Sequence, residues 1–187
     1  LGLEPGDRIG LLGPNGAGKS TLIKLIVGDL AAMQGEVKRS PDLKIGYFAQ
    51  EHDTLDDRAS VWENIRHAAP DAGEQDLRGL LGAFMFSGAQ LDQPAGTLSG
   101  GEKTRLTLAG LVSSAANVLL LDEPTNNLDP ASREEILGAL STFKGAVVLV
   151  THDEGAVDAL QPERILLLPD GVEDFYSADY RDLVTLA

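Results

Sequence analysis

Residues Gly13-Pro14-Asn15-Gly16-Ala17-Gly18-Lys19-Ser20 match the pattern G-x-x-x-x-G-K-[ST] in full. They follow the apolar run Ile9–Leu12 and precede a helical stretch, Thr21–Val27, as this pattern requires. Glycines let the backbone turn sharply and bring its N–H groups close to phosphate oxygens, at a helix end that carries partial positive charge. The stretch therefore predicts a phosphate-binding loop, in which Lys19 reaches the β and γ phosphates and Ser20 binds magnesium.

Short apolar runs rich in Val, Ile and Leu recur between amphipathic stretches, which is typical of a mainly parallel sheet covered by helices. The fold class is therefore expected to be α/β. The runs expected to form strands are Arg8–Leu12, Lys44–Phe48, Val118–Leu121, Ala146–Val150 and Arg164–Leu168. Between Glu51 and Thr97 such runs are missing and apolar residues recur at roughly helical spacing. We expect one domain, 1–187, with a core lobe of 1–50 and 98–187 and a helical subdomain, 51–97.

Three helix starts are marked by polar residues, which accept hydrogen bonds from free backbone N–H groups. Ser99 with Glu102 and Thr151 with Glu154 both have the spacing of a capping box. Asp129 precedes a proline, which favours the first helical position. We therefore expect helices to begin after Ser99, Asp129 and Thr151.

Two acids, Asp122 and Glu123, end the apolar run Val118–Leu121. Their carboxylates should emerge at the carboxyl edge of the sheet, where open α/β folds bind ligands and where the phosphate loop also lies. Asp122 suits the second magnesium position, and Glu123 suits activation of the attacking water as a general base. A single acid at a strand end would often only cap a helix or face solvent, but two in succession favour a functional role.

Composition narrows the classes of function. The 187 residues, 43% of them hydrophobic, are enough for one sizeable core. A net charge of −14 is opposite to that of a protein that grips nucleic acid with its whole surface. The absence of cysteine excludes disulfides and cysteine metal sites. The longest charge-free stretch, Leu106–Leu121, is too short and too polar to span a membrane, so no membrane insertion is expected.

The stretch Leu98-Ser99-Gly100-Gly101-Glu102 resembles the signature motif of ABC ATPases. A capping box accounts for Ser99 and Glu102, but not for the two glycines, which weaken a helix. Together with the phosphate loop and Leu121-Asp122-Glu123-Pro124, this stretch makes the chain similar to the ABC cassettes among the P-loop NTPases. The Ser99 hydroxyl, the glycine N–H groups and the following helix would form a second anion site.

The resemblance covers nearly the whole chain and implies an ATPase with ATP and Mg2+ as cofactors. In this family the signature of one cassette closes over the ATP held by another, so a second ABC cassette is the implied partner. Gln50 matches the glutamine that senses magnesium, His152 the switch histidine near the γ phosphate, and Leu128–Asp129 the loop that meets the partner. The implied contacts with the nucleotide that this chain binds are Gly13, Pro14, Asn15, Gly16, Ala17, Gly18, Lys19, Ser20 and Thr21. The implied contacts with the nucleotide that the partner cassette binds are Ser99, Gly100, Gly101 and Glu102. The implied magnesium ligands are Ser20, Gln50 and Asp122.

Within this family the chain looks most like the second cassette of the ABC-F branch, whose members are paired cassettes that act on the ribosome. The partner cassette would then lie in the same chain; otherwise two copies of the chain would form a homodimer. The stretches that carry the likeness are Gly46–Glu51, Phe84–Gly88, Glu123–Asp129 and Asp174–Tyr180. The resemblance implies a cytoplasmic translation factor or antibiotic-resistance protein with the ribosome and tRNA as partners. The chain has Glu154-Gly155-Ala156 where many ABC-F proteins carry an arginine, which leaves the subgroup open.

We expect the chain to lack its true amino terminus, since it opens at Leu1 within a strand-and-turn context. The aromatic residue that stacks on adenine in this family lies upstream of the phosphate loop, and no residue here matches it.

Two other assignments share the ATP chemistry. A nucleotide-binding subunit of a membrane transporter would dock its helical insertion onto membrane-embedded partners. A chromosome-maintenance or repair cassette is disfavoured, because such cassettes are interrupted by long coiled coils and no sustained heptad pattern is present.

Overall fold

A sheet of six strands forms the centre of the computed structural model, which describes residues 1–49 and 55–186. The strands are β1 Arg8–Leu12, β2 Ile45–Phe48, β3 Val118–Asp122, β4 Ala146–Val150, β5 Arg164–Leu167 and β6 Val172–Phe175. Over the described part of the chain, their order is β2-β3-β4-β1-β5-β6, and all neighbours are parallel except β5 and β6. The predicted α/β class and its mainly parallel sheet are confirmed, with strand ends shifted by at most one residue.

Strand β6 was not among the predicted strands. All four of its residues are exposed, so neither of its faces shows the apolar alternation that marks a half-buried strand. Its antiparallel pairing with β5, from Arg164 opposite Phe175 to Leu167 opposite Val172, holds it at the edge of the sheet. Backbone hydrogen bonds, rather than burial of side chains, therefore define this strand.

Seven α-helices and three short 3-10 helices surround the sheet within the described residues. The α-helices are α1 Lys19–Val27, α2 Val61–Ala68, α3 Glu74–Ala83, α4 Gly100–Ser113, α5 Pro130–Ser141, α6 Glu154–Leu160 and α7 Arg181–Leu186. The 3-10 helices are η1 Gly88–Asp92, η2 Ala95–Thr97 and η3 Ala178–Tyr180. None of the helices in the described residues is both long and apolar enough to cross a membrane.

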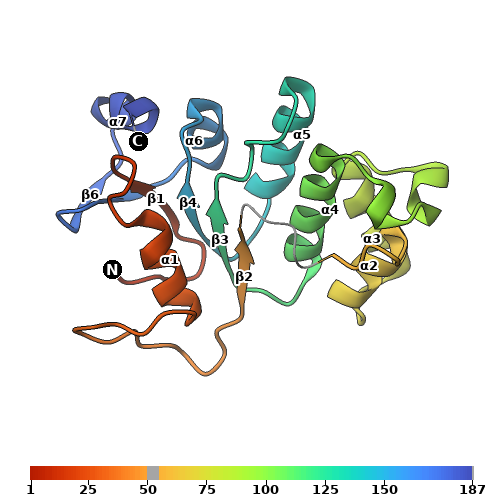
Figure 1. Cartoon of the computed structure of the whole chain (residues 1–187), viewed down its shortest axis with the longest axis horizontal. Helices are drawn as coiled ribbons and strands as arrows, with labels where there is room; N and C mark the ends of the chain where they lie inside the picture. Colours follow the sequence, from red (N-terminus) through yellow and green to blue (C-terminus); the bar gives the residue numbers. More distant parts are fainter. Residues whose placement is uncertain (50–54, 187) are drawn as a thin grey trace.

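The two faces of the sheet carry different helices. Along β3, Val118 and Leu120 share a cluster with Ile23 of α1. Leu119 and Leu121 share another cluster with residues of α4, α5 and α6. Because successive side chains of a strand point to opposite faces, α1 covers one face and α4, α5 and α6 the other. In Figure 1, α1 and α4 accordingly appear on either side of β3.

The described part of segment 51–97 is helical, with α2 and α3 packed on α4 and one isolated β-bridge between Ser60 and Pro94. Ser60 and Glu63 form a complete capping box at the start of α2. Ile65 and Leu81 are fully buried in the same cluster as Leu119 of the sheet. The helical segment therefore continues the core of the sheet and has no separate core in the described residues.

Two of the three predicted helix starts are confirmed. Ser99 caps α4 through a capping box, and Asp129 caps α5 by accepting a hydrogen bond from the Ser132 N–H. The prediction for Thr151 is wrong, because α6 is capped by Asp153, which accepts from the Gly155 N–H. Thr151 is buried instead, and its hydroxyl oxygen accepts from the Asp153 N–H at 3.1 Å. The backbone is still extended at Asp153, so the helix begins two residues later than expected.

Candidate functional site

The phosphate loop connects β1 directly to α1. Gly13, Gly16 and Gly18 have positive φ angles of 151°, 81° and 100°, which residues other than glycine rarely adopt. A Cβ atom at Gly13 would lie 2.5 Å from the carbonyl oxygen of Leu168. Gly18 precedes α1, and no side chain caps the helix, so its first N–H groups keep no side-chain acceptor. This geometry leaves an anion site at the start of α1.

Lys19 folds its side chain back over this loop. Its Nζ donates hydrogen bonds to the carbonyl oxygens of Gly13 at 2.5 Å and Pro14 at 3.3 Å. Burial lowers the pKa of Lys19, and the nearby carboxylates of Glu123 and Asp122 oppose that shift. The ammonium group therefore lies on the loop, close enough to interact with Asp122 at the end of β3 and with Glu123, which follows it.

Strand β3 and the phosphate loop meet through a side-chain contact. The hydroxyl of Ser20, at the start of α1, donates a hydrogen bond to Oδ2 of Asp122 at 2.9 Å. Asp122 is the last residue of β3 and lies opposite Val150 of β4. Within the described residues no group of three or more His, Asp or Glu side chains forms a metal cluster. A hydroxyl beside one carboxylate fits Mg2+, which usually takes one or two protein ligands and completes its shell with phosphates and water.

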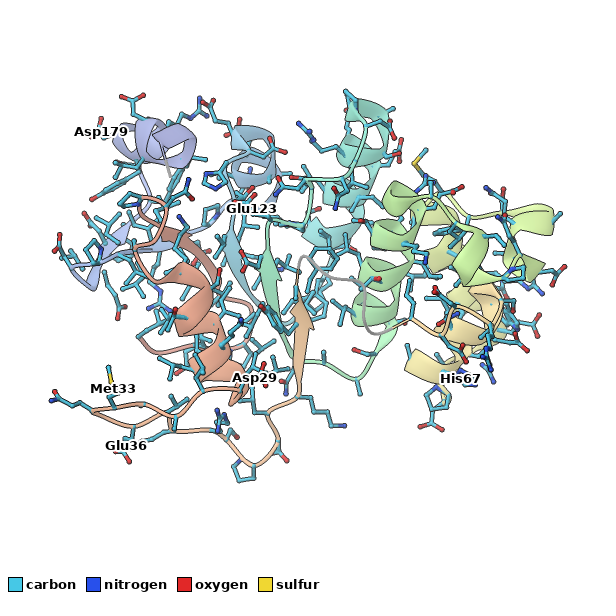
Figure 2. The ribbon with its side chains drawn as sticks, viewed as in Figure 1. Asp29, Met33, Glu36, His67, Glu123 and Asp179 are labelled. Atoms are coloured by element: carbon cyan, nitrogen blue, oxygen red, sulfur yellow. The ribbon has the colours of Figure 1, made fainter. Side chains whose placement is uncertain are left out.

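Glu123 follows in a strained conformation, with φ at 52°, in the left-handed region that bulky residues seldom adopt. Its N–H donates to the carbonyl oxygen of Val150 at 2.9 Å, which keeps the chain against β4 as it leaves the sheet. Figure 2 shows Glu123 at the upper end of β3, whereas Asp29, Met33 and Glu36 lie at the lower end of the molecule. The turn thus presents the Glu123 side chain at the edge where the phosphate loop lies.

The side chains of Glu123 and His152 lie against each other. His152 Nε2 is 3.0 Å from Glu123 Oε1, and the His152 N–H donates a long hydrogen bond of 3.4 Å to Oε2. The Glu123 side chain is only 12% exposed, and its Oε1 has no hydrogen-bond partner despite the approach of the ring. Burial raises the pKa of Glu123, whereas His152 lowers it. The net rise in pKa makes this carboxylate a better proton acceptor than an exposed glutamate.

The residues Ser99–Glu102 lie elsewhere. Ser99 Oγ donates to Glu102 Oε2 at 2.8 Å, and the Glu102 N–H donates to Ser99 Oγ at 3.3 Å. Hydrogen bonds from the backbone and hydroxyl of Ser99 lower the pKa of Glu102. Since α4 and α1 cover opposite faces of the sheet, this stretch does not join the phosphate loop of its own chain. Ser99 and Gly100 are exposed to solvent.

The two glycines of this stretch differ in their surroundings. A Cβ atom at Gly101 would lie 3.0 Å from the carbonyl oxygen of Asn127, so close packing of α4 on the loop after Glu123 favours glycine there. A Cβ atom at Gly100 would meet no atom within 4 Å. Packing within this chain therefore explains why a glycine stands at Gly101, but it does not explain the glycine at Gly100.

The structure thus brings Lys19, Ser20, Asp122, Glu123 and His152 together at the carboxyl ends of β1, β3 and β4. Thr21 lies exposed in the first turn of α1. Gln50 lies outside the described residues. A cleft lined in part by Leu43, Asn117 and Phe143 lies at the amino ends of β3 and β4, apart from all of these residues.

Three residues that were not predicted as site residues meet beside Glu123 and His152: Thr125, Arg133 and Asp153. The Thr125 hydroxyl donates to Asp153 Oδ2 at 3.1 Å, and Arg133 Nε lies 3.3 Å from the same oxygen. The one feature of the sequence that could have indicated Asp153 is its position next to His152, the predicted switch histidine. Thr125 and Arg133 lie in another turn and another helix, so no local sequence pattern indicates their contacts with Asp153.

Comparison with known proteins identifies the family to which these features belong. Residues 1–126 match the family model described as ABC transporter. The probable ATP-binding protein YheS of Haemophilus influenzae is 46% identical over 94% of this chain, which spans 28% of that protein. The probable ATP-binding protein YbiT of Escherichia coli is 40% identical over 96% of the chain and 34% of its own length. The ATP-binding protein Uup of Caulobacter vibrioides is 38% identical over 87% of the chain and 28% of its own length.

A solved structure shares the fold. It is the dimeric structure of a post-hydrolysis state of the ATP-binding cassette MJ0796 bound to ADP and Pi, with a TM-score of 0.75 and 24% identity. The alignment covers 95% of this chain and 89% of that one. At this identity the likeness establishes the fold alone.

Proposed function

This chain belongs to the ABC transporter family, in the ABC-F-like group of YheS and Uup, and on that premise we propose that it hydrolyses ATP jointly with a second cassette and acts on the ribosome. The observation that carries the hydrolytic part is the contact of Glu123 with His152, beside Lys19 and the Ser20–Asp122 pair. The ribosomal part rests on membership of the group.

Cassettes of this family bind ATP together with Mg2+, and the residues present fit both. The glycine loop and the uncapped start of α1 would hold the phosphates, with Lys19 released from its carbonyl partners to reach them. Ser20 and Asp122 would hold Mg2+, and Gln50 would be its third contact. When bound, Mg2+ neutralises charge that develops on the phosphate oxygens.

Glu123 is assigned the role of general base. Its carboxylate takes a proton from water as the water oxygen bonds to the γ phosphorus and the bond to the bridging oxygen breaks, which yields ADP and phosphate. His152 orients the base and the water from the end of β4. The raised pKa of Glu123 makes its carboxylate a stronger base than an exposed glutamate, which favours this proton transfer.

The partner cassette supplies the other side of the site. Ser99 and Gly100, where α4 begins, are exposed on the face opposite α1, which is the arrangement expected if they bind a nucleotide held by another cassette. Asp129, at the exposed start of α5, is the proposed contact with that partner.

At the ribosome, the proposed role is that of a translation factor or an antibiotic-resistance protein near tRNA, and such a role implies the cytoplasm. The comparisons do not favour the alternative of a transporter subunit. The test is co-sedimentation of the natural gene product with ribosomes, using the Glu123→Gln variant with ATP and, as a control, with ADP. Pelleting with ribosomes in ATP and release in ADP is the expected result. Failure to pellet while ATP is bound would remove the ribosomal role and leave the ATPase assignment standing.

A further inference from the structure

The carboxylate of Asp153 joins three segments next to the site. Oδ2 accepts a hydrogen bond from the Thr125 hydroxyl, in the turn after Glu123, and lies 3.3 Å from Arg133 Nε of α5. Oδ1 accepts from the Gly155 N–H at 2.9 Å and so caps α6. Helix capping needs only Oδ1, so the two contacts of Oδ2 require a separate explanation.

Burial makes the contact between Asp153 and Thr125 specific, whereas the Arg133 side chain is 40% exposed. Thr125 is only 2% exposed, and the Asp153 side chain is 18% exposed. A buried hydroxyl needs a partner, so the Thr125 bond fixes where the carboxylate lies. Asp158, in helix α6, also forms an ion pair, with Arg181, but both of these side chains are more than half exposed. Ion pairs exposed to this extent usually contribute little to stability.

The position of Asp153 affects its neighbour directly. His152 precedes it, and the ring and backbone N–H of His152 are what contact Glu123. The Asp153 backbone is extended and its N–H is held by the Thr151 hydroxyl, so the turn has little freedom between β4 and α6. Shifting the Asp153 carboxylate would therefore move the imidazole relative to Glu123. Misplacement of such a group by about 1 Å can lower a rate roughly a hundredfold.

We propose that Asp153 is a positioning residue for ATP hydrolysis, which through Thr125 and Arg133 holds His152 against Glu123 and links this pair to helix α5. The inference rests on the proposed ATPase function. Arg133 lies one turn after Asp129, whose carboxylate caps α5. A displacement of the exposed start of α5 would therefore reach His152 through the Arg133–Asp153 contact.

The test compares variants in which the folded backbone should persist. Thr125→Val removes the hydroxyl with little change in volume, and Thr125→Ser restores it. Asp153→Asn keeps the ability to cap α6 but loses the charge that faces Arg133. Asp158→Asn makes the same change at the exposed end of the same helix and serves as the matched control.

Two measurements are made on the natural gene product. The rate of ATP hydrolysis is measured against ATP concentration, and the ring resonances of His152 are recorded by NMR without nucleotide, with His152→Gln for assignment. We expect Thr125→Val and Asp153→Asn to lower kcat about tenfold or more with KM for ATP nearly unchanged, and to shift the His152 resonances. Thr125→Ser and Asp158→Asn should leave both close to wild type.

A wild-type kcat in Thr125→Val and Asp153→Asn, with unmoved His152 resonances, would overturn the inference while leaving the ATPase function intact. An equal fall in kcat for Asp158→Asn would also overturn it, since the effect would not depend on the contact with Thr125. If the wild-type protein hydrolysed no ATP, the proposed function would fail, and the NMR comparison would still decide whether Asp153 positions His152.

Discussion

Nε2 of His152 lies 3.0 Å from Oε1 of Glu123, although α5 and β4 separate the two residues along the chain. They meet because Asp122 and Val150, the last residues of β3 and β4, lie opposite each other on adjacent parallel strands. Glu123 and His152 follow just beyond these two strand ends. The carboxyl edge of the sheet thus assembles a buried acid and an imidazole from two different turns.

Replacing Glu123 by Gln should abolish most hydrolysis and leave ATP binding intact. The amide keeps the shape of the side chain but cannot accept the proton, so the rate should fall about 100- to 10,000-fold. Phosphate release and equilibrium nucleotide binding would measure the two effects. Glu134→Gln, an exposed change on α5, is the control. Hydrolysis at the wild-type rate would remove Glu123 from the role of base.

The same variant should alter the pH dependence of stability without nucleotide. Because burial raises the pKa of Glu123 above its ordinary 4.5, the folded chain holds the proton more tightly than the unfolded chain. The free energy of unfolding attributable to this group is therefore greatest below 4.5 and falls as pH rises through the raised folded value. Near neutral pH, Glu123→Gln should be more stable than wild type by about 1 kcal/mol.

Urea unfolding at several pH values measures this difference. The gap between the two proteins should widen from acid towards neutral pH. A gap that is the same at every pH would show that the ionisation of Glu123 does not cause it.

Asp122→Asn and Ser20→Ala should weaken the use of magnesium. Ser20 Oγ lies 2.9 Å from Asp122 Oδ2, which is close enough for one cation to bind both oxygens. The Mg2+ concentration for half-maximal hydrolysis should rise by at least about tenfold, because the loss of even an outer-shell partner of a metal ligand typically costs that much. A Mg2+ titration at saturating ATP measures it. Asp158→Asn is the matched control on α6. An unchanged Mg2+ requirement in both site variants would exclude the pair as ligands.

The shared site predicts complementation between two inactive variants. Lys19→Met should lose ATP binding but keep its Ser99–Glu102 stretch, whereas Gly100→Asp should bind ATP but repel the phosphates held by a partner. A Cβ atom at Gly100 meets no neighbour, so this change should not disturb its own fold. In an equal mixture of the isolated chains, random pairing leaves about a quarter of the composite sites intact.

ATP hydrolysis by the mixture, and by neither variant alone, is the expected result. Gly101→Asp is not an equivalent change, because its Cβ would press on the Asn127 carbonyl oxygen. A mixture no more active than its components would count against a site shared between two cassettes.

Much of the fold could be predicted from local patterns. The phosphate loop lies between β1 and α1 as expected, and five apolar runs became strands within one residue of their predicted ends. Ser99 and Asp129 cap the helices that follow them. The errors also have local causes: β6 has no buried face, and Thr151 resembles a cap but is buried while Asp153 takes that role.

The sequence by itself determined which residues can bind phosphate and end strands, because glycine conformation, apolar periodicity and capping act between residues close in the chain. Only the tertiary structure decided that Glu123 meets His152, that Asp153 reaches Thr125 and Arg133, and that Ser99–Glu102 lies on the face opposite α1. These contacts depend on strand order and on which face each helix covers. The long-range pairing of β3 with β4 brings Glu123 to His152, and no local pattern in the sequence shows that pairing.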